Sequence, residues 1–391
     1  MLTDRVNTLS ESITIAITTL AQELKAEGKD ILSFSAGEPD FNTPQVIKDA
    51  AIKAINEGFT KYTAVDGIVE LREAIAAKLK KDNGLTYAPN QIIVNNGAKH
   101  SLFNLFSATI QDGAEVIIPA PYWVTYPELV KYCGGKVVEI ETTDETSFKI
   151  TPEQLKAAIT PKTRMLILTT PSNPTGSIYT KEELVEIAKV LEGTDIIVAS
   201  DEMYEKLTYE GTFTSCAAIS EDMYKRTVTI NGLSKSVAMT GWRFGYMAAA
   251  DTELIKATKK LQSQSTSNVN SITQKAAIAG LDGSADADIE MMRKAFIERR
   301  DEAVKLVNAI DGLSVVKPDG AFYLFVNIKE VSSDSLDFAK ELLDKKLVAV
   351  VPGVAFGSEG YFRMSFATDI DTIRTGIARI AEFVGELKKR V

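Results

Sequence analysis

The chain has 391 residues, 45% of them hydrophobic and 25% charged, which is the balance of an ordinary soluble globular protein. This length predicts two domains with large cores. The net charge of -9, without any block of basic residues, argues against nucleic acid as the main partner.

The few cysteines and the single histidine restrict metal and redox chemistry. Cys133 and Cys216 lack C-x-x-C spacing and have no histidine nearby that could complete a metal set, so we expect both to be reduced residues in or near the core. His100 cannot form a histidine cluster for zinc, and we expect it to pack on a helix. No metal site is therefore predicted.

Targeting and membrane signals are also missing from the sequence. The amino terminus lacks the charged-then-apolar pattern of a signal peptide. No apolar run approaches the roughly 20 residues that a membrane-spanning helix needs. We therefore expect a cytoplasmic protein with no membrane partner.

Residues 1–30 are predicted to form an amino-terminal arm, with the apolar spacing of a helix over residues 15–25. A short strand then runs into a Gly-Glu-Pro turn, where Gly37 permits close approach to the backbone and Pro39 blocks a helix. This turn is a candidate binding element, and a plain tight turn is the alternative. A helix over residues 43–58 follows.

From about residue 90, short and nearly continuous apolar segments alternate with helical patterns. This alternation predicts an α/β fold with a largely parallel sheet covered on both faces. Ligands bind such sheets at the carboxyl ends of the strands, so the residues that follow each strand are the candidates for a site. The predicted strands are 91–95, 115–119, 136–140, 165–169, 195–200, 227–230 and 245–249.

The residues after the first two strands suggest an anion site and a stacking surface. Gly97, Ala98 and Lys99 begin a helix, where exposed backbone N–H groups and the helix dipole favour an anion such as phosphate. Trp123 follows the second strand and offers the largest aromatic face for a planar ring. An ordinary core tryptophan is the alternative for that residue.

Two later loops present single polar groups. Asn173 stands between two prolines in Pro-Ser-Asn-Pro-Thr-Gly, which predicts a rigid loop with one presented amide or, alternatively, a turn capped by that side chain. Asp201 ends a buried strand, where a carboxylate is costly unless it meets a cation. Glu202 competes for that role, and Tyr204 follows three residues after Asp201.

Residues 231–246 read Asn-Gly-Leu-Ser-Lys-Ser-Val-Ala-Met-Thr-Gly-Trp-Arg-Phe-Gly-Tyr. Lys235 follows a buried strand, where loss of hydration favours the neutral amine that forms a Schiff base with a carbonyl. Ser234 and Arg243 supply a hydroxyl and a planar cation that suit a phosphate. An amine that condenses with an aldehyde beside a phosphate clamp indicates pyridoxal 5'-phosphate, whereas a solvated lysine in a glycine-rich turn is the alternative.

The pattern changes after a long charged amphipathic helix over residues 285–309. Arg363 alternates with apolar neighbours, so we expect its side chain to enter a cleft, where its fork of donors suits a carboxylate. A salt bridge at the rim is the alternative. The strands predicted for this smaller α+β domain are 313–316, 322–326, 347–351 and 361–366.

The pattern S-K-x3-M-T-G-W-R-x-G-Y at 234–246 resembles the cofactor-lysine signature of the class I aminotransferases, in particular their aspartate and aromatic group. The motifs N-P-T-G and D-E-x-Y agree with it, and the resemblance extends over essentially the whole chain. It implies the type I pyridoxal-phosphate fold and a homodimer with shared active sites. The implied division is an amino-terminal arm and part of the small domain over 1–43, a large cofactor domain over 44–284, and a linking helix and small domain over 285–391.

The resemblance also implies roles for the residues around the cofactor. Lys235 would hold the cofactor as a Schiff base and shuttle a proton. Asp201 would pair with the protonated pyridine nitrogen, while Tyr204 and Asn173 would contact the phenolic oxygen. Trp123 would stack on the ring.

Substrate and partner contacts follow from the same resemblance. The substrate α-carboxylate would meet Arg363, Asn173 and the backbone of Gly37. Lys99 would meet the distal carboxylate of acidic substrates, as in one branch of the family. Tyr62 would reach across the dimer to the partner's cofactor phosphate, and the polar segment 263–275 would lie near that phosphate.

The predicted function is transfer of an amino group from L-aspartate, or another amino acid, to 2-oxoglutarate by a ping-pong mechanism. An aromatic or alanine-type aminotransferase is the main alternative, and a β-lyase or decarboxylase on the same scaffold is a weaker one. A non-enzymatic regulator with an aminotransferase-like domain would need an added DNA-binding region, for which the motifs leave no room. A nucleotide-binding α/β protein would need G-x-x-x-x-G-K-[ST], or G-x-G-x-x-G after a strand, and neither occurs.

Overall fold

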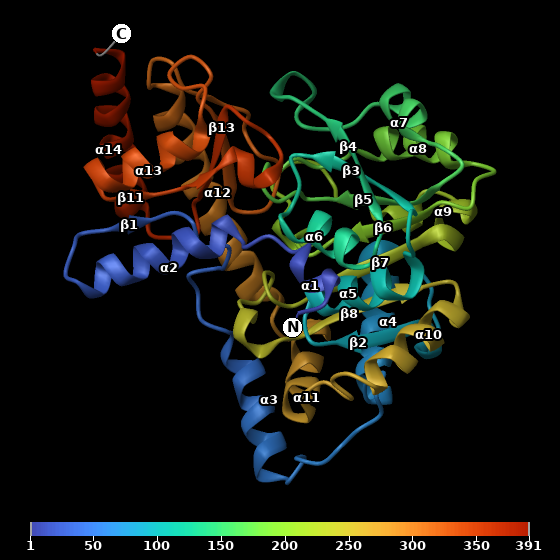
Figure 1. Cartoon of the computed structure of the whole chain (residues 1–391). Coiled ribbons are helices and arrows are strands. Elements are labelled where there is room, and N and C mark those ends of the chain that lie inside the picture. Colours follow the sequence, from blue (N-terminus) through green and yellow to red (C-terminus); the bar gives the residue numbers. More distant parts are fainter. Residues whose placement is uncertain (1, 390–391) are drawn as a thin grey trace.

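A seven-stranded sheet forms the centre of the larger part of the molecule in the computed structural model, which describes residues 2–389 (Figure 1). The strand order is β2-β8-β7-β6-β5-β3-β4. Strand β8 runs antiparallel to both of its neighbours, and all other neighbouring strands pair in parallel. The expected α/β fold with a mostly parallel sheet is confirmed. The strands are β2 Ile92–Asn95, β3 Glu115–Ala120, β4 Lys136–Glu141, β5 Thr163–Thr169, β6 Ile197–Asp201, β7 Thr227–Gly232 and β8 Gly245–Ala249.

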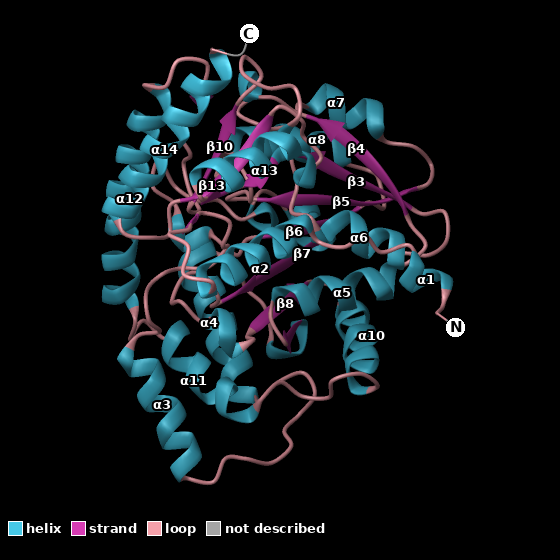
Figure 2. Ribbon diagram, turned by 60° about the vertical axis from the view of Figure 1, so that its left-hand side comes forward, coloured by secondary structure: helices cyan, strands magenta, loops and turns pink. Residues whose placement is uncertain are grey.

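Helices cover both faces of this sheet because its strands are apolar on both sides (Figure 2). In β2, Ile93 packs in the same apolar cluster as residues of α5, whereas Ile92 and Val94 pack with α3, α4 and α11. The helices of this part are α3 Gln45–Asn56, α4 Val69–Asn83, α5 Ala98–Thr109, α6 Thr125–Tyr132, α7 Pro152–Ala158, α8 Lys181–Leu191, α9 Glu221–Arg226, α10 Thr252–Ser263 and α11 Ser271–Leu281.

Short polar side chains begin many of these helices. Thr180 accepts a hydrogen bond from the backbone N–H of Glu183, whose carboxylate accepts one from the N–H of Thr180. Asp251 and Asn270 cap α10 and α11 in the same manner, with a side-chain oxygen that accepts from backbone N–H groups. Each such cap contributes about 1 kcal/mol to helix stability.

A second, antiparallel sheet with the order β12-β13-β10-β9 lies in the carboxyl-terminal part. Its strands are β9 Ser314–Val315, β10 Tyr323–Asn327, β12 Val351–Pro352 and β13 Tyr361–Ser365, and the helices of this part are α12 Asp286–Asn308, α13 Ser335–Lys346 and α14 Ile370–Lys388. The single strand expected over 347–351 is wrong. It divides into β11 Val348–Ala349, which pairs with β1, and β12, which pairs with β13.

Segments from the amino-terminal and carboxyl-terminal parts of the chain meet in a two-stranded parallel sheet. Strand β1 (Leu32–Ser33) pairs with β11, with Leu32 opposite Val348. The amino-terminal helices α1 (Asp4–Asn7) and α2 (Ile13–Ala26) precede β1, and Ala21 of α2 packs with Leu343 of α13. The arm expected at the amino terminus is therefore joined to the carboxyl-terminal part.

One apolar cluster runs through both main sheets and connects them. It includes Ile167 and Met247 of the large sheet together with Phe296 of α12 and Phe362 of β13. Buried apolar area of this size is the main stabilising contribution to a fold. Continuity of the core places the carboxyl ends of β5, β6 and β7 against the smaller sheet.

The described residues also bear on membranes and metals. Within residues 2–389, none of the helices is long and apolar enough to cross a bilayer. Over the same range there is no group of three or more His, Cys, Asp or Glu side chains placed to hold a metal ion. Cys133 is partly exposed and Cys216 is buried, and both are free thiols.

Candidate active site

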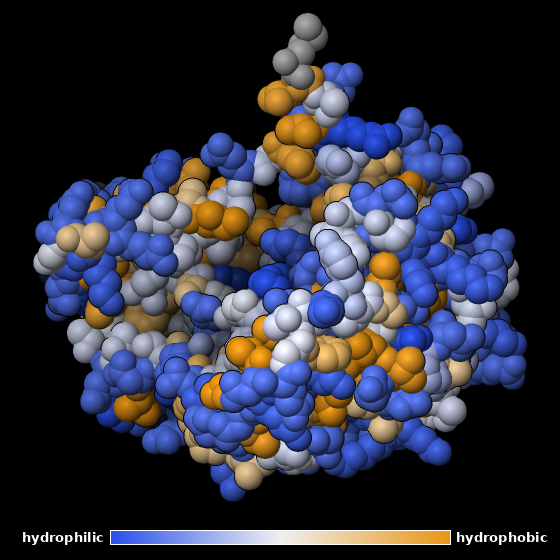
Figure 3. Space-filling model, turned by 90° about the horizontal axis from the view of Figure 1, so that it is seen from below, coloured by the Kyte–Doolittle hydropathy of each residue, from blue (hydrophilic) through white to orange (hydrophobic). Residues whose placement is uncertain are grey.

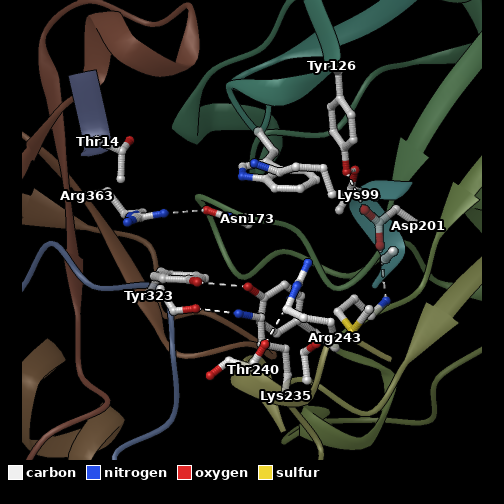
Figure 4. A pocket seen from close by; sticks show the side chains of 17 residues that line it. Thr14, Lys99, Tyr126, Asn173, Asp201, Lys235, Thr240, Arg243, Tyr323 and Arg363 are labelled. Atoms are coloured by element: carbon white, nitrogen blue, oxygen red, sulfur yellow. Dashed lines mark hydrogen bonds between the residues drawn. The ribbon is translucent and has the colours of Figure 1, made fainter. Parts of the chain in front are cut away.

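A cavity of about 310 Å³ lies at the carboxyl ends of the central strands, where these strands face the smaller sheet (Figure 4). It is large enough for a ring-sized ligand and a small substrate. Most of the candidate residues line it, namely Gly37, Ala98, Lys99, Trp123, Asn173, Asp201, Tyr204, Ser234, Lys235, Arg243 and Arg363. The expectation that polar groups following separate strands share one site is met for these residues.

Lys235 lies in the floor of the cavity, shortly after the end of β7. Its ammonium group donates a hydrogen bond to the carbonyl oxygen of Gly37. Burial lowers the pKa of Lys235 to about 8, Glu38 opposes this shift, and the charges of Arg363 and Arg243 add to it. A substantial fraction of this amine is therefore neutral, and so nucleophilic, at mildly alkaline pH.

Asp201 is a buried carboxylate at the end of β6. It accepts hydrogen bonds from the hydroxyl of Tyr126 at 2.8 Å and from the backbone N–H of Met203 at 3.2 Å. Burial raises the pKa of Asp201, although both hydrogen bonds oppose the shift. None of the ion pairs among residues 2–389 includes Asp201, so a cation in the cavity would stabilise its charge.

Glu202, the competitor for this acidic role, is directed away from the cavity. Its Oε1 accepts hydrogen bonds from the hydroxyls of Ser200 and Ser215, both at 2.8 Å. Burial raises the pKa of Glu202 to about 7, and the nearby charge of Glu205 adds to the shift. Because Glu202 does not line the cavity, Asp201 is the carboxylate available to a ligand there.

A candidate anion site lies at the start of α5. Gly97 precedes this helix with a φ of 81°, and a Cβ at that position would lie 2.5 Å from a guanidinium nitrogen of Arg243. Ser234 is buried at the cavity wall, and Arg243 donates to the carbonyl oxygen of Thr240 at 2.9 Å. The first N–H groups of a helix lack partners within the helix, so Ala98 belongs to a suitable cradle for phosphate.

Arg363 is a cation buried at the opposite wall, with only 2% of its surface exposed. It donates to the side-chain oxygen of Asn173 at 2.9 Å and to the carbonyl oxygen of Ser35 at 2.7 Å (Figure 4). Its Nε has no partner, and none of the ion pairs of the described chain includes it. The side chain therefore occupies a cleft as expected, and a carboxylate would complete its interactions.

Trp123 and Lys99 lie together at the rim. The ammonium group of Lys99 lies 5.0 Å from the centroid of the Trp123 ring, which is within the range of a cation–π contact. Burial lowers the pKa of Lys99, and the charge of Arg243 adds to the shift. Thr14 of α2 also reaches the cavity, and its buried hydroxyl has no hydrogen-bond partner.

Tyr62 differs from the other candidates because 91% of its surface is exposed and it does not line the cavity. Its expected contact with the cofactor of a second subunit stays a prediction. His100 lies outside the cavity as well, and its Nδ1 accepts from the backbone N–H of Asn96 at 3.2 Å. It packs at the first turn of α5, as expected.

Several cavity residues were missed in the sequence. Tyr126 follows Trp123 by three positions, the spacing of one helical turn, so this pattern could have identified it. Thr14 and Tyr323 reach the cavity through contacts between distant parts of the chain, which carry no local signal. Thr240 lies within the lysine motif and donates to Glu38 at 2.9 Å.

Comparison with known proteins agrees with this geometry. Residues 29–380 match the family described as aminotransferase class I and II. The chain belongs to this family. It is 50% identical over 389 residues to an aspartate aminotransferase of Bacillus subtilis, which covers 98% of both chains. An aspartate/prephenate aminotransferase of Nitrosomonas europaea is 47% identical over 396 residues and covers 98% of this chain and 99% of that protein.

Solved structures of the family have the same fold. An aspartate aminotransferase of Thermus thermophilus with maleate superposes with a TM-score of 0.94 at 42% identity and covers 98% of this chain and 99% of its own. An aromatic aminotransferase of Pyrococcus horikoshii gives a TM-score of 0.91 at 40% identity with the same coverage. The resemblance to class I aminotransferases is confirmed, and the protein is a pyridoxal-phosphate-dependent transaminase of the type I fold.

Proposed function

We propose that the protein transfers the amino group of L-aspartate to 2-oxoglutarate and that the cavity around Lys235 is its active site. The observation that supports this most directly is the placement of three groups. A partly neutral amine, Lys235, lies in one cavity with a buried carboxylate, Asp201, and a buried cation, Arg363, and neither Asp201 nor Arg363 has an ion-pair partner among residues 2–389.

The residues of the cavity fit pyridoxal 5'-phosphate. When bound, this cofactor supplies an electron-withdrawing ring that stabilises negative charge at the substrate α-carbon. Asp201 would keep a proton on the ring nitrogen, Asn173 would donate to the phenolic oxygen, and the hydroxyl of Tyr204 would lie within hydrogen-bond reach of that oxygen. The proposed cofactor contacts are Gly97, Ala98, Lys99, Ser234 and Arg243 near the phosphate, Trp123 over the ring, Lys235 at the aldehyde carbon and Tyr62 from a second subunit.

The chain's own groups would orient the substrate and move a proton. Arg363 and Asn173 would bind the α-carboxylate, together with the backbone of Gly37. Lys235 would take the proton from the substrate α-carbon and deliver it to the aldehyde carbon of the cofactor. A base works best when its pKa lies near the working pH, and the pKa of about 8 for Lys235 meets this condition.

The preference for an acidic substrate rests on the rim of the cavity. Lys99 offers a cation at this rim, whereas Thr14 lies beside Arg363 (Figure 4). A second carboxylate on the substrate would pair with Lys99. Relatives named aspartate aminotransferase, at 49–50% identity, support this choice.

Two other amino-group partners are alternatives. Relatives named aspartate/prephenate aminotransferase, at 46–47% identity, suggest prephenate as a further acceptor. The likeness to the aromatic aminotransferase of Pyrococcus horikoshii keeps an aromatic donor open. For such a donor the side chain would lie along the Trp123 face rather than reach Lys99.

The proposed organisation is a cytoplasmic homodimer of two-domain subunits, with residues 44–284 as the large domain and 1–43 and 285–391 around the small one. In support of a dimer, half of the surface of Ile52, Ile55 and Val69, at 51% each, and nearly all of Tyr62 are exposed. Figure 3, which views the molecule from the side of α3, shows apolar groups among the polar ones on this face. A second copy would cover them and bring Tyr62 to the other active site.

An absorption experiment on the cofactor-loaded protein tests the proposal. L-Aspartate is added without any 2-oxo acid, and the band of the aldehyde form of the cofactor is expected to give way to that of its amino form. A persistent aldehyde band would remove aspartate as donor and favour the aromatic or alanine-type alternative. In Lys235→Ala, turnover should be lost while the protein stays folded, and near-normal turnover would refute the role of Lys235.

A further inference from the structure

Tyr323 is a buried phenol of the cavity to which the proposed chemistry assigns no task. It begins β10, and none of its surface is exposed. Its hydroxyl lies 2.8 Å from the hydroxyl of Tyr204, and either oxygen can be the donor (Figure 4). A phenol pair buried in this way costs free energy unless the hydrogen bond is made, so the two hydroxyls act as one unit.

This pair connects the two ends of the site. The guanidinium carbon of Arg363 lies 4.4 Å from the centroid of the Tyr323 ring. The Tyr323 hydroxyl lies against the backbone of Gly37, since a Cβ on Gly37 would lie 3.0 Å from it. The carbonyl oxygen of the same Gly37 accepts a hydrogen bond from Lys235. At the other end, the ammonium group of Lys235 lies 6.0 Å from the centroid of the Tyr204 ring.

The pair has two protons but shares only one hydrogen bond, so it has two arrangements. If Tyr323 donates to Tyr204, the proton of Tyr204 is free to be donated on the Lys235 side. If Tyr204 donates to Tyr323, its oxygen becomes an acceptor on that side, and the proton of Tyr323 is left for an anion bound beside Arg363, whose guanidinium lies over the Tyr323 ring. An anion bound to Arg363 attracts a donor and therefore favours the second arrangement.

We propose that Tyr323 is a positioning residue that couples the carboxylate site of Arg363 to Lys235, because it sets whether the hydroxyl of Tyr204 donates or accepts. The inference rests on the proposed function. A carboxylate on Arg363 selects the accepting state of Tyr204, which stabilises a proton on the Lys235 nitrogen. Carboxylate binding thus makes the cofactor carbon bound to Lys235 a better electrophile for the substrate amine, before Lys235 is released to act as the base.

The test uses the pH titration of the absorption band of the cofactor bound to Lys235, with and without saturating maleate. Maleate has two carboxylates and no amino group, so it occupies the site without reacting. In the parent protein we expect maleate to raise the pKa of the band. Tyr323→Phe keeps the ring and its packing but removes one hydrogen bond of the tyrosine pair. It should therefore reduce the maleate-induced rise in the pKa by about half a unit or more.

A double-mutant cycle with Tyr204→Phe separates the relay from a direct effect of Tyr323 on the ligand. In the Tyr204→Phe background, Tyr323→Phe should leave the maleate-induced rise unchanged. Tyr179→Phe is the matched control, because it removes an equally buried hydroxyl that accepts from Ile150 at 3.0 Å outside the cavity. It should not alter the rise.

An undiminished rise in Tyr323→Phe would overturn the proposal, and so would an equal reduction in both backgrounds, which would mean that Tyr323 acts on maleate directly. If the loaded parent protein shows no band of a lysine-bound cofactor at any pH, the proposed function itself is refuted. If the band titrates but the effects of Tyr323→Phe and Tyr204→Phe on the maleate-induced rise are additive, only the coupling through the tyrosine pair is refuted.

Discussion

Replacing Lys235 by methionine should stabilise the cofactor-free protein at neutral pH. In the folded chain the pKa of Lys235 is lowered from 10.5 to about 8, chiefly by burial. A difference of about 2.5 units corresponds to about 3 kcal/mol of unfolding free energy at 1.36 kcal/mol per unit. Loss of the hydrogen bond to Gly37 subtracts about 1 kcal/mol, which leaves a net gain of about 2 kcal/mol.

The sign of the pH dependence follows from proton binding. The unfolded chain holds the Lys235 proton more tightly than the folded chain, so the penalty is fully present below pH 8 and vanishes as the pH rises through 10.5. Methionine carries no proton and no penalty. The difference in unfolding free energy between Lys235→Met and the parent protein should therefore be largest near pH 7 and close to zero at about pH 10.

Urea unfolding of both cofactor-free proteins at these two pH values measures the gap. Lys260→Met is the matched control, since Lys260 is exposed on α10 and the same substitution there should change little. A variant less stable than the parent at pH 7, or a gap that does not depend on pH, would refute the reasoning that burial of the amine destabilises the fold.

Three further substitutions test the site. Arg363→Lys keeps the charge but loses the planar fork, so kcat/KM should fall about 30- to 100-fold for aspartate and alanine alike in steady-state assays, and a loss confined to aspartate would contradict the assignment. Lys99→Met should lower kcat/KM about 5- to 30-fold for aspartate and leave alanine unchanged, whereas equal losses would place Lys99 in cofactor binding alone. Asp201→Asn should lower the single-turnover rate about 100-fold or more without lowering the urea midpoint, because it removes a buried carboxylate whose pKa is raised; an unaltered rate would show that another group balances the ring nitrogen.

The parts of the site that could be predicted are those in which a side chain follows a strand directly. Asp201 ends β6 and Lys235 follows β7, and neighbouring parallel strands bring their carboxyl ends together. Strand alternation alone therefore predicts that these two residues lie close to each other. The sequence motifs then indicate the chemical roles of these two residues, whose proximity follows from the strand order.

Other parts depend on tertiary contacts that no local pattern reveals. Tyr323 meets Tyr204 because the segment before β10 pairs with the segment after Tyr204, where the N–H of Ala321 donates to the carbonyl oxygen of Leu207, and Thr14 reaches the cavity from the amino-terminal helix α2. The division of residues 347–351 into two strands has the same origin, because Val348 and Val351 pair with different partners. Apolar β-branched residues suit either partner equally, so composition cannot distinguish one long strand from two short ones.

The parallel pairing of β1 with β11 has a consequence for biosynthesis. Leu32 leaves the ribosome about 300 residues before its strand partner Val348, and Arg363 follows later still. At about 5–20 residues per second, the large sheet can form while the amino-terminal arm still waits for its partner. A chain that stops before Val348 would thus hold Lys235 in the folded large sheet but lack Arg363, so the cavity is completed only once β13 has been made.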